Sequence, residues 1–234
     1  MAIACPCPAC GTPHPLPASA LGSKQVCRGC GGVFRAADRC FHCHEFVIYD
    51  LETTGLYPDS DEFIQIAAVK FRDGKLCSGE SFHSYAKPRR RIPSFIEQYT
   101  GVTNSHVRDA ARPEEVLREF AAFAGQATLI AHNGKRFDSK FLHATCTRHG
   151  LPRRPVDCID SIHLSKLTFG RTRGTGHSMD HLTTRLGLGG ATFRRHDARG
   201  DVEILGMAVA AMHRMLDLDH AFNGVERHQS LLPV

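Results

Sequence analysis

FVIYDLETTG, residues 46–55, is the stretch of sequence that decides the fold. Its four apolar residues, 46–49, predict a short buried strand. Because successive strand side chains point to opposite faces, Asp50 and Glu52 share one face while Leu51 points to the other. Two neighbouring carboxylates repel each other by about 1 kcal/mol at 4 Å even in water. The pair is therefore unfavourable at a strand end unless a cation neutralises it, although a D-x-E pair alone is also a common pattern of exposed acids.

Strand and helix patterns alternate on the C-terminal side of this stretch. Strands are expected at 63–71 and 76–86, with Asp73 and Gly74 forming a hairpin turn between them, and again at 128–131 and 156–159. Arg112 and Pro113 open a predicted helix, and further helices are expected at 137–149, 178–186 and 197–216. This order predicts an α/β fold in which helices flank a mixed sheet.

Two further acidic segments follow the expected strands. HNGKRFD, residues 132–138, places Asp138 at the start of a helix, where an acid also suits the helix dipole. HDARGD, residues 196–201, opens the last long helix, with Asp197 as its N-cap, Asp201 one turn further in and His196 just before it. Each segment alone has a structural explanation, so the prediction of a site depends on their meeting.

Four carboxylates are expected to converge at the C-terminal edge of the sheet: Asp50, Glu52, Asp138 and Asp201. Oxygen ligands favour Mg²⁺ or Mn²⁺ over zinc. Two such ions held roughly 3.5–4 Å apart form the clamp that in-line phosphodiester hydrolysis requires. Histidine titrates near neutral pH, so His196 is expected to accept the proton of the attacking water.

Together, DLETTG, HNGKRFD and HDARGD resemble the three exonuclease motifs of the DEDDh 3′–5′ exonucleases, whose fold is ribonuclease-H-like. This superfamily includes the proofreading subunit of bacterial DNA polymerase III, RNase T and oligoribonuclease. The likeness runs over about residues 46–216, and residues 88–103 between the motifs share it. The four tyrosines lie far from the third motif, so the histidine type is the match and not the tyrosine type.

The resemblance implies a role for each motif residue. It assigns metal ligation to the four carboxylates and the general base to His196. It also implies a pocket for the terminal nucleotides lined by Thr53, Thr54, Gly55, His132, Asn133 and Phe137. The expected reaction releases nucleoside monophosphates from single-stranded 3′ ends of DNA or RNA, as in DNA repair. The sequence does not separate DNA from RNA.

Residues 1–44 have a different composition, dominated by Cys, Gly and Pro. Seven of the ten cysteines lie within the first 43 residues, and in a reducing compartment this crowding indicates metal binding. A C-x2-C-x16-C-x2-C pattern predicts one tetrahedral zinc bound by Cys7, Cys10, Cys27 and Cys30, and it resembles a zinc ribbon. Two alternatives stay open. Cys5 could replace Cys7 or Cys10, and Cys40 and Cys43 could replace another pair, bind a second ion or be free thiols.

The composition is that of a globular protein with a net charge of +5, which permits a polyanion partner without requiring one. Basic clusters stand at 87–91, 153–154, 171–173 and 194–195. The expected ribbon could grip nucleic acid, contact a protein partner or cap the catalytic domain, and a homodimer is a further expectation. No apolar run approaches the roughly 20 residues that span a bilayer, and the start does not read as a signal peptide. We therefore expect a cytoplasmic protein without a membrane partner.

The expected domain boundaries are 1–44 for the zinc ribbon, 45–218 for the exonuclease domain and 219–234 for a C-terminal tail. Residues 229–232 faintly resemble a sliding-clamp-binding peptide, but a frayed terminus is the preferred interpretation. Two other functions compete with the exonuclease. One is a non-catalytic nucleic-acid-binding adaptor with the same fold, and the other is a different metal-dependent phosphohydrolase built on His196 and Asp197.

Overall fold

Two units, Met1–Glu45 and Phe46–Val234, make up the chain. The computed structural model describes residues 2–7, 9–20, 22–36, 45–171, 176–188, 196–218, 222 and 224–234. Cys40, Cys43 and the basic pair at 194–195 lie outside the described residues, so the predictions made for them stay predictions. None of the helices in the described ranges is long and apolar enough to cross a membrane.

The small unit is built from two short hairpins. β1 (Ala2–Pro6) pairs antiparallel with β2 (Pro13–Pro17), which leads into the 3-10 turn η1 (Ala18–Ala20). β3 (Lys24–Val26) pairs antiparallel with β4 (Val33–Arg35). The buried apolar cluster of the small unit contains three cysteines and Phe34, with Leu16 packed against them. Cysteine thus fills the place that large aliphatic side chains take in an ordinary core.

A six-stranded sheet forms the centre of the large unit, in the order β10-β9-β8-β5-β6-β7 among the described residues. Its strands are β5 (Glu45–Thr53), β6 (Phe63–Arg72), β7 (Lys75–Tyr85), β8 (Thr128–Ala131), β9 (Arg153–Asp160) and β10 (His228–Pro233). β5, β8 and β9 are parallel, whereas β6 and β7 form an antiparallel hairpin. Its turn has positive φ at both Asp73 (51°) and Gly74 (74°), which confirms the expected tight turn.

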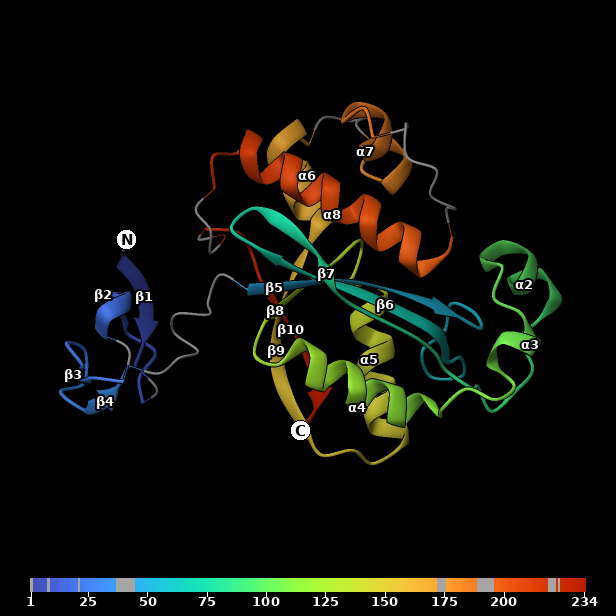
Figure 1. Ribbon diagram of the computed structural model, residues 1–234, viewed down its shortest axis with the longest axis horizontal. Coiled ribbons are helices and arrows are strands. Elements are labelled where there is room, and N and C mark those ends of the chain that lie inside the picture. The colour runs from blue at the N-terminus through green and yellow to red at the C-terminus, as the bar shows by residue number, and fades with distance from the viewer. Residues whose placement is uncertain are drawn as a thin grey trace. The chain divides into compact units, whose positions relative to one another are not determined.

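Helices cover both faces of this sheet (Figure 1). α4 (Pro113–Ala124) and α5 (Asp138–Arg148) pack on one face. α6 (Ser161–Phe169), α7 (Met179–Arg185) and α8 (Ala198–Met215) pack on the other. α2 (Ser94–Thr100) and α3 (Asn104–Val107) form a short pair at one end of the sheet (Figure 1). The predicted mixed sheet flanked by helices is confirmed.

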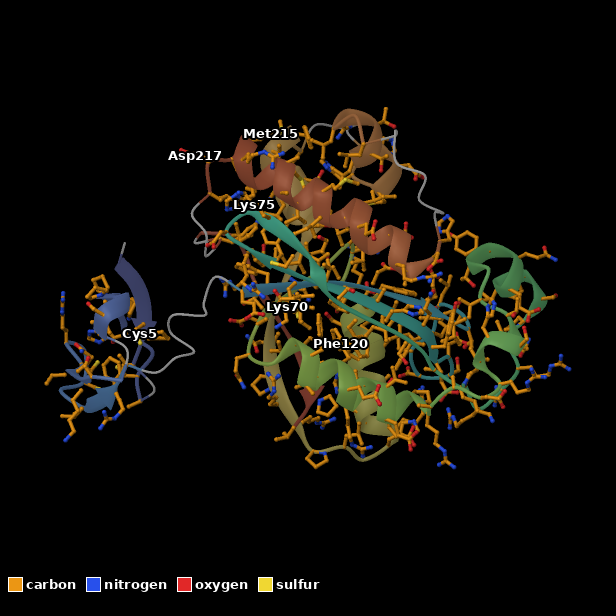
Figure 2. All side chains as sticks on the ribbon, viewed as in Figure 1. Cys5, Lys70, Lys75, Phe120, Met215 and Asp217 are labelled. Atoms are coloured by element: carbon orange, nitrogen blue, oxygen red, sulfur yellow. The ribbon has the colours of Figure 1, made fainter. Side chains whose placement is uncertain are left out.

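The core is divided by β5. Val47, Tyr49 and Leu51 belong to the apolar cluster under α4 and α5, where Phe120 lies 5.5 Å from Tyr49 between ring centroids. Phe46 and Ile48 belong to the cluster under α8. Figure 2 shows Phe120 on the α4 side of the sheet and Met215 at the end of α8 on the other side. The alternation expected of residues 46–52 therefore decides which side chains face α8.

The C-terminal residues correct one expectation. The frayed tail expected at 219–234 contains β10, which pairs antiparallel with β9 from His228–Cys158 to Pro233–Arg153. Leu232 is fully buried, so residues 229–232 are part of the sheet and not a free clamp-binding peptide. α2, α3 and α6 were also not expected from the sequence.

Candidate functional site

Three carboxylates meet where β5 passes under α8. Asp50 and Glu52 share the face of β5 that also carries Phe46 and Ile48, and this face is covered by α8. Asp201 lies in the first turn of α8. Ligand oxygens of the three residues all lie within 4.8 Å of one another, while Glu52 is only 8% exposed and Asp201 only 7%. Like charges this close and this buried require a cation or a proton to offset them.

Asp138 is not one of these three residues, but it contacts the strand that carries two of them. It begins α5, is 2% exposed, and its carboxylate accepts a hydrogen bond from the backbone N–H of Leu51, the residue between Asp50 and Glu52. Its Oδ1 has no hydrogen-bond partner among the described residues. Burial raises the pKa of Asp138 to about 7, and the nearby negative charge of Asp160 adds to this effect. A buried carboxylate oxygen without a donor fits a site meant for a cation.

His196 lies beside this cluster in a strained backbone conformation, with φ at 60°. Its backbone N–H donates to Oδ2 of Asp201 at 3.1 Å, which ties the two residues of the third motif together. Its ring lies against Tyr99 of α2, with the ring centroids 4.1 Å apart. Tyr99 remains 59% exposed, so the pair presents an aromatic surface to solvent. A non-glycine residue with positive φ at such a place is typical of a functional site.

The start of α8 is held by a buried glutamine that the sequence analysis did not single out. Gln65 on β6 is 1% exposed; its Nε2 donates to Oδ1 of Asp197 at 3.0 Å, and its Oε1 accepts from the backbone N–H of Ala198 at 3.3 Å. Asp197 in turn caps the helix by accepting from Arg199 N–H at 3.2 Å. Gln65 therefore fixes the segment from which His196 and Asp201 project.

The loop after β5 is locked by polar contacts. Thr54 Oγ1 donates to Asp61 Oδ1 at 3.2 Å, and the Glu62 N–H donates back to Thr54 Oγ1 at 3.1 Å. A Cβ at Gly55 would lie 2.4 Å from Oδ2 of Asp61, so a larger residue there would displace the Asp61 carboxylate from its bonds. Glu62 is buried and pairs with Arg89 at 3.1 Å. Arg89, a member of the basic cluster at 87–91, is thus partly used to hold this loop.

The second motif is held by Asp160 at the end of β9. Its carboxylate accepts from the backbone N–H groups of Asn133 at 3.1 Å and Lys135 at 3.3 Å, and it also caps α6. Asn133 has a φ of 60°, a conformation that this support stabilises. His132 contacts Ser161 Oγ through Nδ1 at 2.8 Å. Asp160 is 22 residues beyond Asp138 in the sequence, and no motif pointed to it.

The other residues expected to line a nucleotide pocket lie close to these motifs. Thr53 is buried and donates from Oγ1 to the carbonyl of Gly55 at 2.6 Å. Phe137 packs on Phe141, with ring centroids 4.9 Å apart. Their contact with a nucleotide stays a prediction.

The four cysteines predicted as zinc ligands form a second cluster, in the small unit. The sulfurs of Cys7, Cys10, Cys27 and Cys30 all lie within 4.8 Å of one another. The sulfur–sulfur distances are 3.9 Å for Cys7–Cys30 and 3.4 Å for Cys10–Cys27. These values lie on either side of the separation of about 3.8 Å that a tetrahedron with 2.3 Å Zn–S bonds requires. Cys5 is buried in the same core but does not belong to this group.

Each cysteine pair sits in the same kind of tight turn. Gly11 N–H donates to the carbonyl of Cys7 at 2.8 Å, and Gly31 N–H donates to that of Cys27 at 2.9 Å. Both glycines have φ above 70°, a conformation that a Cβ would strain. Two matching turns thus aim two thiols each at one point.

Donors around Cys27 favour its thiolate. Burial alone would raise the pKa of the Cys27 thiol, but the N–H groups of Cys30 and Gly29 and the ring of His14 outweigh it and lower the pKa to about 5. His14 is buried, with Nε2 3.4 Å from the Cys27 sulfur. A thiolate is the form that binds a metal.

Comparison with known proteins places the large unit in a family. A family model described as Exonuclease (RNase T) matches residues 47–208. A DNA polymerase III subunit epsilon-like protein of Rhodobacter capsulatus is 38% identical over 81% of this chain. A PolC-type DNA polymerase III of Latilactobacillus sakei is 35% identical over 74% of the chain. The matched regions make up only 27% and 12% of these two relatives.

Solved structures show the same fold at low sequence identity. The nuclease domain of 3′hExo, a DEDDh family member bound to rAMP, matches 80% of this chain and 97% of its own with a TM-score of 0.64 and 18% identity. Exonuclease X in complex with 5′ overhanging duplex DNA matches 75% of this chain and 95% of its own, with a TM-score of 0.60 and 22% identity. The chain therefore belongs to the exonuclease family, and its large unit shares the fold of these solved nucleases.

Proposed function

We propose that the large unit removes nucleoside monophosphates from the 3′ ends of single-stranded nucleic acid by two-metal-ion phosphodiester hydrolysis. The observation that carries this proposal is the meeting of three buried or half-buried carboxylates, together with the buried Asp138 oxygen that has no donor in the described part of the chain. Asp50, Glu52 and Asp201 would hold the ions with Asp138. Bound Mg²⁺ or Mn²⁺ supplies an activated water and offsets charge on the scissile phosphate and the leaving oxygen.

His196 is proposed as the general base. Its backbone is fixed by the bond to Asp201, while its ring lies on the exposed face of Tyr99 rather than in the core. In this position the imidazole would accept a proton from the attacking water. Gln65 and Asp197 would fix the positions of the His196 imidazole and the Asp201 carboxylate, because both residues hold the start of α8.

Exposed apolar side chains next to the acids favour a single strand as substrate. Tyr99 lies against His196, and Phe95 is exposed one turn earlier on α2. Leu56 and Tyr57 are exposed directly after the Thr53–Gly55 segment. Unpaired bases stack on such side chains with about 1–3 kcal/mol per base, whatever their identity. We infer that the terminal nucleotides contact this surface together with the backbone near Gly55 and Asn133.

Parallel digestion of matched single-stranded and double-stranded DNA and RNA tests the proposal. Each substrate carries a 5′ fluorophore, and one copy of each is blocked at its 3′ end with phosphorothioate linkages. We expect a ladder of products shortened from the 3′ end in the presence of Mg²⁺ or Mn²⁺, which the 3′ block suppresses. Asp50→Ala should remove the ladder.

Three results would contradict the proposal. Shortening from the 5′ end would show the opposite polarity, and internal cleavage would show an endonuclease. Binding that is insensitive to EDTA, with no cleavage of any substrate, would indicate an adaptor. Release of phosphate from small phosphate esters, without release of nucleotides from polymers, would indicate a different phosphohydrolase.

The small unit is proposed to hold one structural Zn²⁺ through Cys7, Cys10, Cys27 and Cys30. All four positions are taken by protein sulfur, as in closed structural sites, and His14 orients the Cys27 sulfur from outside. Metal analysis of the purified chain tests this: we expect one zinc per chain, lost together with the thiols in a Cys7→Ser and Cys30→Ser double variant. A cytoplasmic location, a role in DNA repair, a protein partner and a homodimer stay predictions.

A further inference from the structure

The β3–β4 hairpin has an outer face made of Lys24, Val26, Val33 and Arg35, which we call the hairpin face. The strand register places Lys24 directly opposite Arg35, and Val26 directly opposite Val33. The intervening pair, Gln25 and Phe34, points to the other side, where Phe34 packs with the buried cysteines. Two cations and two valines therefore share one surface.

This face is unfavourable for a protein surface that contacts only water. Val26 is 66% exposed and Val33 is 67% exposed, although they form a directly opposed β-branched pair. Like charges directly opposite each other on paired strands destabilise the pairing. Arg35 also donates to the carbonyl of Gly22, a bond that uses one of the five N–H donors of its guanidinium.

The charged side chains described on and near the hairpin face are all cations. Residues 1–37 contain no Asp or Glu, whereas Lys24, Arg28 and Arg35 are all exposed. Arg28 lies within the second cysteine turn, in the segment that connects β3 to β4. The complementary partner is therefore an anion that also offers apolar surface. Nucleic acid combines both, with phosphates for the cations and sugar and base faces for the valines, and base faces are accessible only in a single strand.

We propose that the hairpin face binds single-stranded nucleic acid, with Lys24, Arg28 and Arg35 on phosphates and the Val26–Val33 pair on sugars and bases. This adds a second contact with the strand in the small unit, separate from the residues proposed for catalysis. It does not depend on the proposed catalytic mechanism, because binding can be measured without cleavage.

Binding of a fluorescein-labelled oligo-dT to the full zinc-loaded chain tests this proposal. All proteins carry Asp50→Ala so that no variant degrades the probe. Lys24→Ser, Arg28→Ser and Arg35→Ser together should weaken binding about tenfold or more at moderate salt. Because each phosphate contact on a single strand contributes about 0.7 to the slope of log K against log salt, the slope should fall by about two. Val26→Ser and Val33→Ser together should weaken binding and leave the slope unchanged.

A matched control removes three exposed cations of the large unit: Lys75→Ser, Arg118→Ser and Arg214→Ser. An equal loss of affinity in this control would show that only total charge matters and would overturn the proposal. Unchanged affinity and slope in the triple hairpin variant would also overturn it. The same cations could serve only to offset the formal charge of −2 on a zinc held by four thiolates, so zinc retention against a chelator is measured in parallel. Lost zinc retention with unchanged probe binding would replace the proposal with that structural role.

Discussion

The chain builds its two clusters of candidate metal ligands in opposite ways. In the small unit the ligands are themselves the core: Cys7 and Cys27 are buried beside Phe34, and few other apolar side chains support them. In the large unit the acids stand at the edge of two extensive apolar clusters that form on either side of β5 without them. The sheet and α8 bring Asp50, Glu52 and Asp201 together although their charges oppose it.

Because of this difference, the two kinds of metal would have different roles. In the proposed zinc site, four cysteines take the place of a hydrophobic core in a segment that is poor in apolar residues, so zinc-binding energy and folding energy would be the same quantity there. The acidic cluster instead costs stability, which the apolar packing of the large unit supplies. Removing one of the cysteines should therefore unfold the small unit, whereas removing one of the acids should leave the large unit folded.

The largest expected effect is that of zinc removal. Apparent zinc-binding free energies of about 10–16 kcal/mol in zinc-finger peptides far exceed the stability that the small core can supply. We expect a strong chelator, or Cys27→Ser, to remove hydrogen-exchange protection from the amides of β3 and β4 while the amides of β5 keep theirs. Protection that persists in β3 and β4 without zinc would contradict the view that zinc binding folds the small unit.

The next largest effect is expected from Asp201→Asn. Loss of a metal ligand should lower kcat by more than about 100-fold, the upper range for residues that only support a ligand. The melting temperature should stay the same or rise, because one of three crowded charges is removed. Asp109→Asn, at an exposed position outside the three motifs, is the control. A fall in activity that merely follows a fall in folded protein would count against this view.

Asp138→Asn should stabilise the metal-free chain in a pH-dependent way. The pKa of Asp138 is raised from 3.8 to about 7, so its ionisation costs folding free energy that accumulates between these values and is fully present above pH 7. About three pKa units correspond to at most about 4 kcal/mol. Chemical unfolding should show this gain at about pH 8 and less than half of it at about pH 5. Equal gains at both values would mean that the charge is not the cause.

The smallest effect is expected from Gln65→Leu. Losing the bonds to Asp197 and Ala198 loosens the segment that carries His196, so kcat should fall by roughly tenfold, or about 1.4 kcal/mol, with little change in KM. Gln126→Leu, at an exposed turn, is the control. If KM rose while kcat held, Gln65 would contribute to substrate binding rather than to the position of the base.

Local patterns predicted most of this architecture. The alternation in residues 46–52, the Asp73-Gly74 turn and the Pro113 helix start act within a few residues, and all appear where expected. α2 was missed because it is seven residues long and follows a proline, too short for a clear apolar period. β10 was missed because it is defined by its pairing with β9, about 70 residues earlier in the chain.

The motifs located the acidic residues of the candidate site but not the residues that support them. Asp50, Glu52 and Asp201 could be placed together because strand alternation and the helix start fix their directions. Gln65, Tyr99 and Asp160 act on motif residues from distant positions through hydrogen bonds or ring contacts. Such contacts leave no local pattern, so only the folded chain reveals them.

The position of β10 bears on where this domain can be cut. The family model matches the chain up to residue 208, and a chain shortened to 218 would keep every acidic motif. It would nevertheless lose the outermost strand, and with it the contact of His228 with Ser139, the neighbour of Asp138. The uncovered edge of β9 would offer unpaired backbone groups to other molecules. A fragment trimmed to the motifs should therefore aggregate during expression even though no catalytic side chain is missing.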